Sequence, residues 1–176
     1  TVAEENGVHG SQHLDSSLLH ADMGFTLDTH GHPGVMSYKA PGKNQIHIHI
    51  AGKAAHAGVE PEKGINAIKA AGELLVDAPQ GCNVGRIVGG SATNVVADSC
   101  DIYYESRSRN KEKLDTITQR IVDHFKLGEE GTGCKITAEV SPDYGPYEIP
   151  QDAPAIEVAR RAAEKLGFPM LKGENL

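Results

Sequence analysis

Two adjacent carboxylates, Glu4 and Glu5, stand near the start of the chain, and Asp28 follows 23 residues after Glu5. Adjacent acids at a strand end can divide the work of metal-assisted hydrolysis. One carboxylate binds the metal, while its neighbour takes a proton from the metal-bound water. Two neighbouring glutamates are more often a solvated surface, so the pair alone leaves both interpretations open.

A second candidate is His56, which stands in the run KAAHAGVEPE of residues 53–62. It lies between an expected strand and an expected helix, among small residues that let a substrate approach closely. A histidine placed there can donate a hydrogen bond to a developing oxyanion, and such a donor is worth about 10²–10³ in rate when it is preorganised. The alternative interpretation is an ordinary loop histidine.

Two further side chains are candidates for substrate contacts. Asn94 lies in the glycine-containing run GGSATNVVAD of residues 89–98, which is either a plain turn or a loop that offers an amide donor. Arg107 ends an expected strand, where it either pairs with Glu105 or binds a substrate carboxylate in a bidentate manner. By contrast, His47 and His49 share one face of a strand and are explained either by metal chelation or by a solvated sheet face.

Composition restricts the partners that we expect. The chain of 176 residues has 17 Lys and Arg against 24 Asp and Glu, and its net charge of -7 argues against nucleic acid and against anionic membranes as partners. No apolar run approaches the roughly 20 residues that span a bilayer. Cys82, Cys100 and Cys134 are widely spaced, which favours reduced thiols and a cytoplasmic location.

The middle of the chain has the clearest pattern of secondary structure. Period-2 alternation predicts a strand over Lys43–Ala51, with Ile46, Ile48 and Ile50 on its apolar face. Apolar residues at helical spacing predict one helix from Pro61 to about Val76 and another from Lys111 to Leu127, with Gly128 as the stop. Three further strands are expected at residues 83–88, 100–107 and 134–140. The class is therefore α+β, with a ferredoxin-like β-α-β-β-α-β order over residues 43–141: an antiparallel sheet with both helices on one face.

The flanking residues carry too few apolar side chains for a core of their own. Before the middle region, we expect a polar helical stretch over Gly10–Leu19 and strands at Met23–Leu27 and Val35–Lys39. After it, we expect Asp152 to cap a helix over Ala155–Leu166.

We therefore divide the chain into three segments. Two of them, residues 1–40 and 143–176, are interpreted as edges of one interrupted α/β domain, and residues 41–142 as a compact insert. Because the candidate active site begins at the first residues, we expect the chain to be cut from a longer protein.

Taken together, these motifs resemble the dizinc exopeptidase family of peptidase T, carboxypeptidase G, aminoacylase and succinyl-diaminopimelate desuccinylase, in particular its peptidase T-like members. The matching motifs occur in order over about residues 1–140. They are Glu4-Glu5-x-Gly7, Gly24-Phe25-Thr26-Leu27-Asp28, Gly52-Lys53-Ala54-Ala55-His56-Ala57-Gly58, Pro61-Glu62, Gly64, Gly89-Gly90-x-Ala92-Thr93-Asn94-Val95-Val96, and the strand up to Arg107.

The resemblance implies a role for each acidic candidate. Glu4 is the general base that activates a water bridging two zinc ions, and Glu5 and Asp28 are zinc ligands. At most two of the five protein ligands of such a site are present in this chain, so two carboxylates without imidazole should hold zinc weakly at best.

The resemblance also makes residues 41–142 a lid or dimerisation domain. His56 would stabilise the tetrahedral oxyanion, in dimeric members from the partner subunit. Asn94 and Arg107 would contact the backbone or the terminal carboxylate of the substrate. A homodimer through the lid, often by pairing of sheet edges, is expected. This chain departs from the pattern with Glu105 where Asp is usual and Ala97 where Pro is common.

Three functions follow as hypotheses. The parent protein is a zinc-dependent aminopeptidase or tripeptidase acting on short peptides, and this chain is its lid region with catalytic-domain remnants, inactive alone. A second hypothesis keeps the chemistry and changes the substrate to an N-acyl amino acid. The third is a dimerisation or interaction module without turnover.

Overall fold

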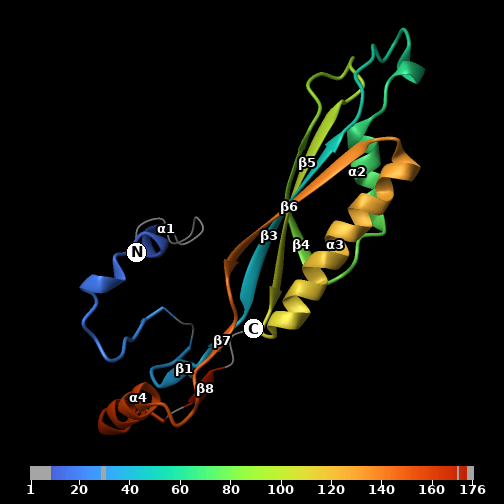
Figure 1. The fold of residues 1–176 in the computed structure, drawn as a ribbon. Helices are drawn as coiled ribbons and strands as arrows, with labels where there is room; N and C mark the ends of the chain where they lie inside the picture. Colours follow the sequence, from blue (N-terminus) through green and yellow to red (C-terminus); the bar gives the residue numbers. More distant parts are fainter. Residues whose placement is uncertain (1–8, 29–30, 170, 174–176) are drawn as a thin grey trace. The chain divides into compact units, whose positions relative to one another are not determined.

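The chain divides into two units in the computed structural model, which describes residues 9–28, 31–169 and 171–173. Unit 1 combines Thr1–Ala40 with Glu148–Leu176, and unit 2 is the continuous segment Pro41–Tyr147. Unit 2 contains the predicted ferredoxin-like region together with His56, Asn94 and Arg107, so it is described first (Figure 1).

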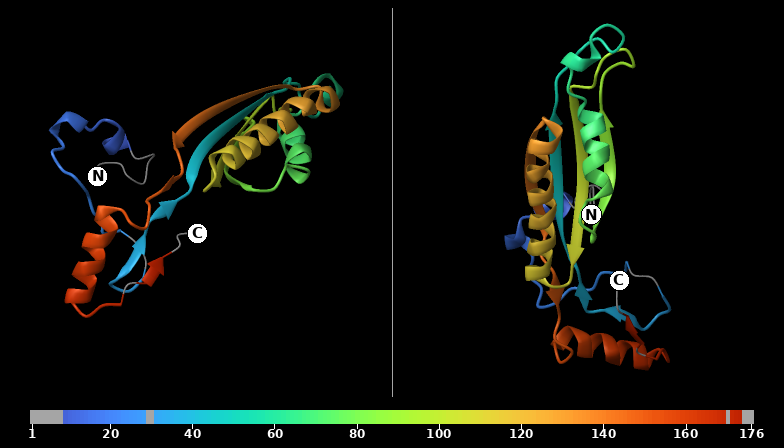
Figure 2. Two further views of the ribbon diagram at one scale, coloured as in Figure 1. Left: turned by 60° about the horizontal axis from the view of Figure 1, so that its bottom comes forward. Right: turned by 90° about the vertical axis from the view of Figure 1, so that its right-hand side faces the viewer.

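Unit 2 is a four-stranded antiparallel sheet with the strand order β4-β5-β3-β6. Figure 2 shows both of its long helices on the same side of this sheet. The predicted α+β class and β-α-β-β-α-β order are therefore confirmed. The elements are β3 (Gly42–Ala51), η2 (Pro61–Lys63), α2 (Ala67–Val76), β4 (Cys82–Gly89), β5 (Ser99–Ser108), α3 (Lys111–Thr132) and β6 (Lys135–Tyr144).

Apolar and polar side chains alternate along β3, and this alternation determines which face of the sheet the helices cover. Ile46, Ile48 and Ile50 are at most 1% exposed and pack beneath the helices, whereas the intervening histidines lie on the opposite, open face. Phe125 of α3 is fully buried and meets the Tyr104 ring edge-on, with the ring centroids 5.7 Å apart. Burial of each such side chain contributes about 1.5–3 kcal/mol.

Helix α2 begins at Ala67, so the predicted start at Pro61 is wrong. Pro61–Lys63 forms one 3-10 turn, and the chain then extends because Ile65 exchanges two backbone hydrogen bonds with Lys53, of 2.8 and 2.9 Å. Asn66 is the N-cap, since its side chain accepts a hydrogen bond of 3.0 Å from the backbone N–H of Lys69.

Helix α3 ends at Thr132, and the following Gly133 caps it with a left-handed φ of 71°, so the predicted stop at Gly128 is also wrong. Gly128 lies inside the helix and has a packing role. A Cβ at this position would lie only 2.4 Å from Cδ2 of Leu74, so the missing side chain lets α2 and α3 approach each other.

The described part of unit 1 contains short strands and an amphipathic helix. Parallel strands β1 (Val35–Ser37) and β8 (Leu171–Gly173) pair with each other, and β2 (Lys39–Ala40) pairs with β7 (Tyr147–Glu148). Helix α4 (Pro154–Lys165) has Ala153 at its N-cap position, without a side-chain hydrogen bond. The expectation that Asp152 caps this helix is therefore wrong.

The first described segment is less regular than its sequence predicts. It contains α1 (His9–Gln12) and η1 (Ser16–Leu18), the latter capped by Asp15. The predicted strand at Met23–Leu27 does not form, since these residues have no ladder partner within the described part of the chain. Leu27 is 98% exposed there.

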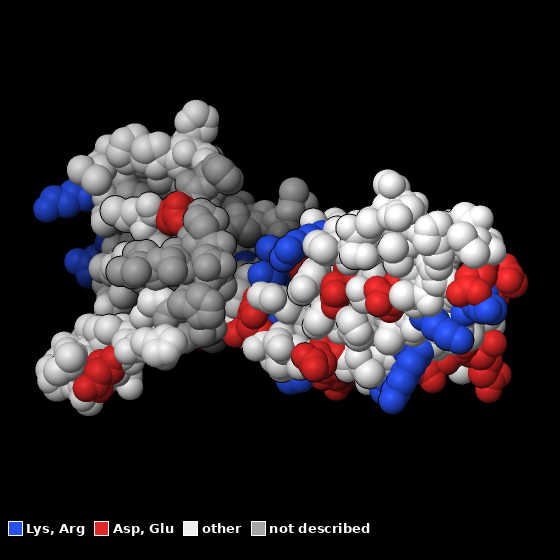
Figure 3. All heavy atoms as spheres, turned by 90° about the horizontal axis from the view of Figure 1, so that it is seen from above, with Lys and Arg blue, Asp and Glu red and all other residues white. Residues whose placement is uncertain are grey.

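The surface of unit 2 carries charges of both signs. In Figure 3, basic and acidic side chains lie close to one another over the face of unit 2 that is seen there. Within the described ranges, no helix combines the length and the apolar character that crossing a membrane requires.

Candidate functional site

Two loops at one end of the unit 2 sheet bring His56 and Asn94 together. His56 forms an isolated antiparallel bridge with Val95, and the backbone N–H of Ala57 donates a hydrogen bond of 2.9 Å to the carbonyl of Asn94. Val96 donates a similar bond to Ala55. Residues that are 38 positions apart in the sequence therefore form one tip, which lies at the upper end of unit 2 in Figure 1.

The hydrogen bond made by His56 indicates which ring nitrogen carries its proton. The backbone N–H of Gly58 donates to Nδ1 of His56 over 3.2 Å, so Nδ1 is an acceptor in the neutral ring. The proton then lies on Nε2, and the exposed ring presents this N–H as a donor. This is the form of the side chain that can stabilise an oxyanion.

The loop of Asn94 is anchored while its side chain remains exposed. Val96 and Ala97, which follow it, are buried, and the carbonyl of Ala97 accepts a 2.8 Å hydrogen bond from the first residue of α2. A Cβ on Gly64 would lie 2.8 Å from Val96, so glycine allows the two loops to pack closely. Ala97, where the sequence resemblance leads us to expect Pro, keeps the loop anchored through its carbonyl.

Arg107 lies at the opposite end of the sheet from this tip. Both tip loops leave the sheet at the end where Ala51 pairs with Ser99, and Arg107 follows Ser99 by eight residues along β5. At the usual rise of a strand, this separation is about 25 Å. One chain therefore does not bring His56 and Arg107 to the same small substrate.

The guanidinium of Arg107 is held by Glu105 on the same strand face. Nε donates to Glu105 over 2.9 Å and Nη2 over 3.4 Å, and this hydrogen bonding raises the pKa of Arg107 above its usual value. Of the two alternatives that the sequence leaves open for Arg107, pairing with Glu105 is thus observed. A substrate carboxylate would have to bind a part of the guanidinium that Glu105 does not use.

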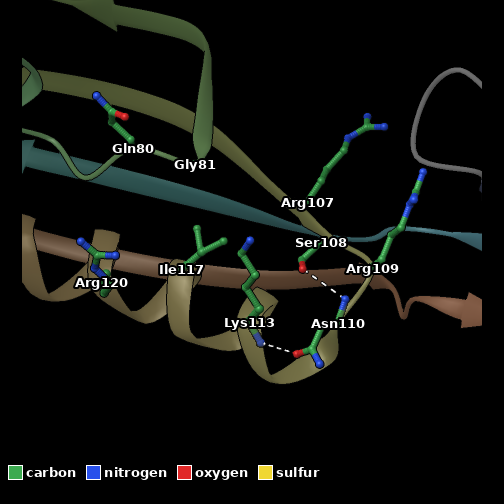
Figure 4. A pocket seen from close by; sticks show the side chains of 9 residues that line it. All are labelled: Gln80, Gly81, Arg107, Ser108, Arg109, Asn110, Lys113, Ile117 and Arg120. Atoms are coloured by element: carbon green, nitrogen blue, oxygen red, sulfur yellow. Dashed lines mark hydrogen bonds between the residues drawn. The ribbon is translucent and has the colours of Figure 1, made fainter. Parts of the chain in front are cut away.

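A hollow of about 730 Å³ borders the same end of unit 2 (Figure 4). Four of its lining residues are cationic and none is a carboxylate. In Figure 4, Arg107 and Arg109 extend outward from its rim. The lining residues are Gln80, Gly81, Arg107, Ser108, Arg109, Asn110, Lys113, Ile117 and Arg120. All four cationic residues stand within residues 107–120, but their spacing does not show that the end of β5 and one side of α3 border the same hollow.

The acidic candidates contribute little to the described structure. Glu4 and Glu5 lie outside the described residues, and Asp28 is an exposed carboxylate. Among the residues that the structure describes, no three His, Cys, Asp or Glu side chains gather in a way that would hold a metal ion. The described residues therefore do not by themselves fit a zinc ion.

His47 and His49 are explained by a shared carboxylate on the open face of the sheet. Nε2 of His47 and Nδ1 of His49 lie 2.7 and 2.9 Å from the same oxygen of Asp101, and His47 stacks on Tyr103. The hydrogen bonds from His49 and His47 lower the pKa of Asp101 despite its partial burial.

Comparison with known proteins adds family information to this geometry. Residues 38–131 match the model of the peptidase dimerisation domain, M20_dimer. The chain is 36% identical to the uncharacterized protein YqjE of Bacillus subtilis, over 96% of this chain and 47% of that protein. It is also 36% identical over 92 residues to one of the subunits of p-aminobenzoyl-glutamate hydrolase from Escherichia coli, a match that covers 47% of this chain and 20% of that protein.

Solved structures give the same result over nearly the whole chain. Aminopeptidase PepT of Bacillus cereus matches with a TM-score of 0.83 and 34% identity, over 99% of this chain and 49% of that one. A tripeptidase of Staphylococcus aureus matches with a TM-score of 0.88 and 31% identity, over 99% and 48%. The chain thus spans about half the length of these relatives.

Proposed function

The chain belongs to the family of M20 peptidases with a dimerisation domain, and we propose that its full-length protein is a zinc-dependent exopeptidase that hydrolyses short peptides. In this proposal, unit 2 is the lid and the dimerisation surface. The similarity to an aminopeptidase and to a tripeptidase supports peptides as the substrate class. The observation that carries the proposal is that His56 and Asn94 lie at one end of β5 and Arg107 at the other. A second copy of the chain is therefore needed to bring these residues to one substrate.

The two edge strands of the unit 2 sheet, β4 and β6, are not equally suited to pairing with the sheet of a second copy. Edge strand β4 carries one charged residue, and its Val84, Ile87 and Val88 are each 40–49% exposed. The other edge, β6, carries charges and a proline, which oppose edge-to-edge pairing. We therefore propose a homodimer that joins the two sheets through β4.

Such a dimer would complete the site. A two-fold axis makes the paired β4 strands antiparallel, so the Gly89 end of one faces the Cys82 end of the other. Because Cys82 pairs with Ser106, Arg107 of one protomer would lie at the same end of the joined sheet as His56 of the other. Each site would then use Arg107 from one chain, and His56 and Asn94 from the other.

The chain's own residues would have distinct roles in this shared site. Nε2–H of His56 would donate to the oxyanion that forms at the scissile carbonyl, and Asn94 would donate its amide to the peptide backbone. Arg107 would hold the terminal carboxylate in a bidentate manner. These contacts favour short peptides, because the anchor and the oxyanion donor lie a fixed distance apart.

The metal site of the full-length protein is proposed from the resemblance to the family. Glu4 would be the general base, and Glu5 and Asp28 would be ligands to zinc. The described residues do not hold a metal by themselves, so the proposal places the remaining ligands in the rest of the full-length protein. These 176 residues alone should therefore show no zinc-dependent turnover.

Kinetics of the full-length protein tests this function. It should contain zinc and hydrolyse tripeptides faster than N-acetyl amino acids. His56→Ala should lower kcat by about 10²–10³ and leave the zinc content unchanged. His49→Ala, a histidine in the same unit but on the open sheet face, is the matched control. Preferential hydrolysis of N-acetyl amino acids would contradict the peptide assignment, and an unchanged kcat in His56→Ala would contradict the oxyanion role.

A further inference from the structure

Arg107 is the outermost member of a chain of polar contacts that crosses three strands on the open face of unit 2. Glu105 accepts two hydrogen bonds from Arg107, and Lys43 of β3 lies 3.8 Å from Glu105. Lys43 in turn lies 3.0 Å from Asp143 of β6, which also accepts two hydrogen bonds from Gln45, of 2.8 and 3.1 Å. The β3–β5 register places Lys43 opposite Arg107 and Gln45 opposite Glu105.

Burial falls steadily from the inner to the outer end of this chain of contacts. The side chain of Asp143 is 11% exposed, that of Glu105 is 32% exposed, and that of Arg107 is 51% exposed. The inner members are thus fixed by the sheet, while the guanidinium reaches solvent. An exposed arginine normally loses much rotamer freedom when it binds a ligand, and a side chain that is already fixed loses less.

The geometry of the pair leaves one edge of the guanidinium open. Glu105 occupies Nε and Nη2, which are two adjacent donors of the planar group. Nη1 and the second N–H of Nη2 have no hydrogen-bond partner among the residues that the structure describes. These two nitrogens form a second bidentate edge of the kind that recognises carboxylates. Figure 4 shows Arg107 extending away from the side chains of α3.

We propose that Glu105, braced by Lys43 and Asp143, is a positioning residue that orients Arg107 so that its Nη1/Nη2 edge receives the carboxylate of the substrate. This inference rests on the proposed function, because it needs Arg107 to bind a terminal carboxylate. Glu105 itself does not touch the substrate. Its effect is to lower the conformational entropy lost on carboxylate binding, and so to set the preference for peptides with a free carboxyl end.

The test compares two substrates in the full-length protein: a tripeptide with a free carboxyl end, and the same tripeptide with a terminal amide. Glu105→Gln should raise KM for the acid about three- to tenfold, with kcat nearly unchanged, and leave the kinetics of the amide unaltered. Glu105→Asp should recover part of the loss. In Arg107→Met, the KM values for the acid and for the amide should become equal.

Glu139→Gln is the matched control, since Glu139 is an exposed carboxylate on the same sheet and has no ion pair within the described residues. Thermal unfolding of each variant checks that the sheet remains intact. If the ratio of KM for the acid to KM for the amide is the same in Glu105→Gln as in the wild type, the positioning role is overturned. A lower KM for the acid also overturns it, because it would show that Glu105 competes with the substrate. Absence of hydrolysis of both peptides by the wild type instead overturns the proposed function.

Discussion

Replacing one apolar residue on the β4 edge should weaken the dimer without damaging the fold. Val88 is 46% exposed and lies on the open face, opposite Asp101 in the β4–β5 register. Covering its exposed half in a dimer contributes about 1 kcal/mol per protomer. In Val88→Lys this contribution is lost, and each buried ammonium adds a desolvation cost of about 1 kcal/mol or more. With two copies per interface, the total is about 4 kcal/mol, which raises the dissociation constant by two to three orders of magnitude.

Sedimentation velocity over a concentration series measures this change directly. The matched control is Val140→Lys, which places the same charge at a residue of 42% exposure on the other edge strand, β6. Far-UV circular dichroism should show the same secondary structure and a similar melting temperature for Val88→Lys as for the wild type. A Val88→Lys protein that stays dimeric at low concentration would refute the β4 interface. Dissociation of Val140→Lys instead would place the interface at β6.

Two predictions concern the stability of unit 2. Phe125→Ala should lower the free energy of unfolding by about 3–5 kcal/mol, because it empties a fully buried position, whereas Leu127→Ala on the same helix, at 79% exposure, should have little effect in urea titration. Asp101→Asn should reduce stability at neutral pH. Since contacts with His49 and His47 lower the folded-state pKa of Asp101, its contribution is present above the unfolded-state pKa and is lost as the pH falls through the folded value. The difference between Asp101→Asn and the wild type in urea midpoint should thus shrink in strongly acidic buffer, and a constant difference down to that range would contradict this explanation.

Local patterns in the sequence predicted the elements of unit 2 but not all of their ends. Alternation in β3 is informative because one face is buried and the other is not, as Ile48 and His49 show. The start of α2 was mispredicted because the Lys53–Ile65 bridge, a tertiary contact, competes with helix formation after Pro61. Gly128 was mistaken for a stop because its sequence does not reveal that Leu74 packs against it.

The sequence selects candidate residues for the site but does not give their arrangement. Residue types and motifs selected His56, Asn94 and Arg107. Their distribution over two ends of one sheet depends on strand register, which the sequence does not state. Likewise, the four cations of the basic hollow stand within residues 107–120, but the sequence does not state that the end of β5, α3 and Gln80 border one hollow.

We propose that His56 and Arg107 act in the same site only across a dimer. Assayed with a free-carboxyl tripeptide well below the wild-type KM, full-length His56→Ala and Arg107→Met proteins should each be nearly inactive. In a heterodimer of the two, one site loses both residues and the other keeps both. Dissociating and reassembling an equal mixture should therefore restore about one quarter of the wild-type activity, since about half of the dimers are mixed and each has one intact site. A reassembled mixture that stays as inactive as the two separate variants would contradict the shared site.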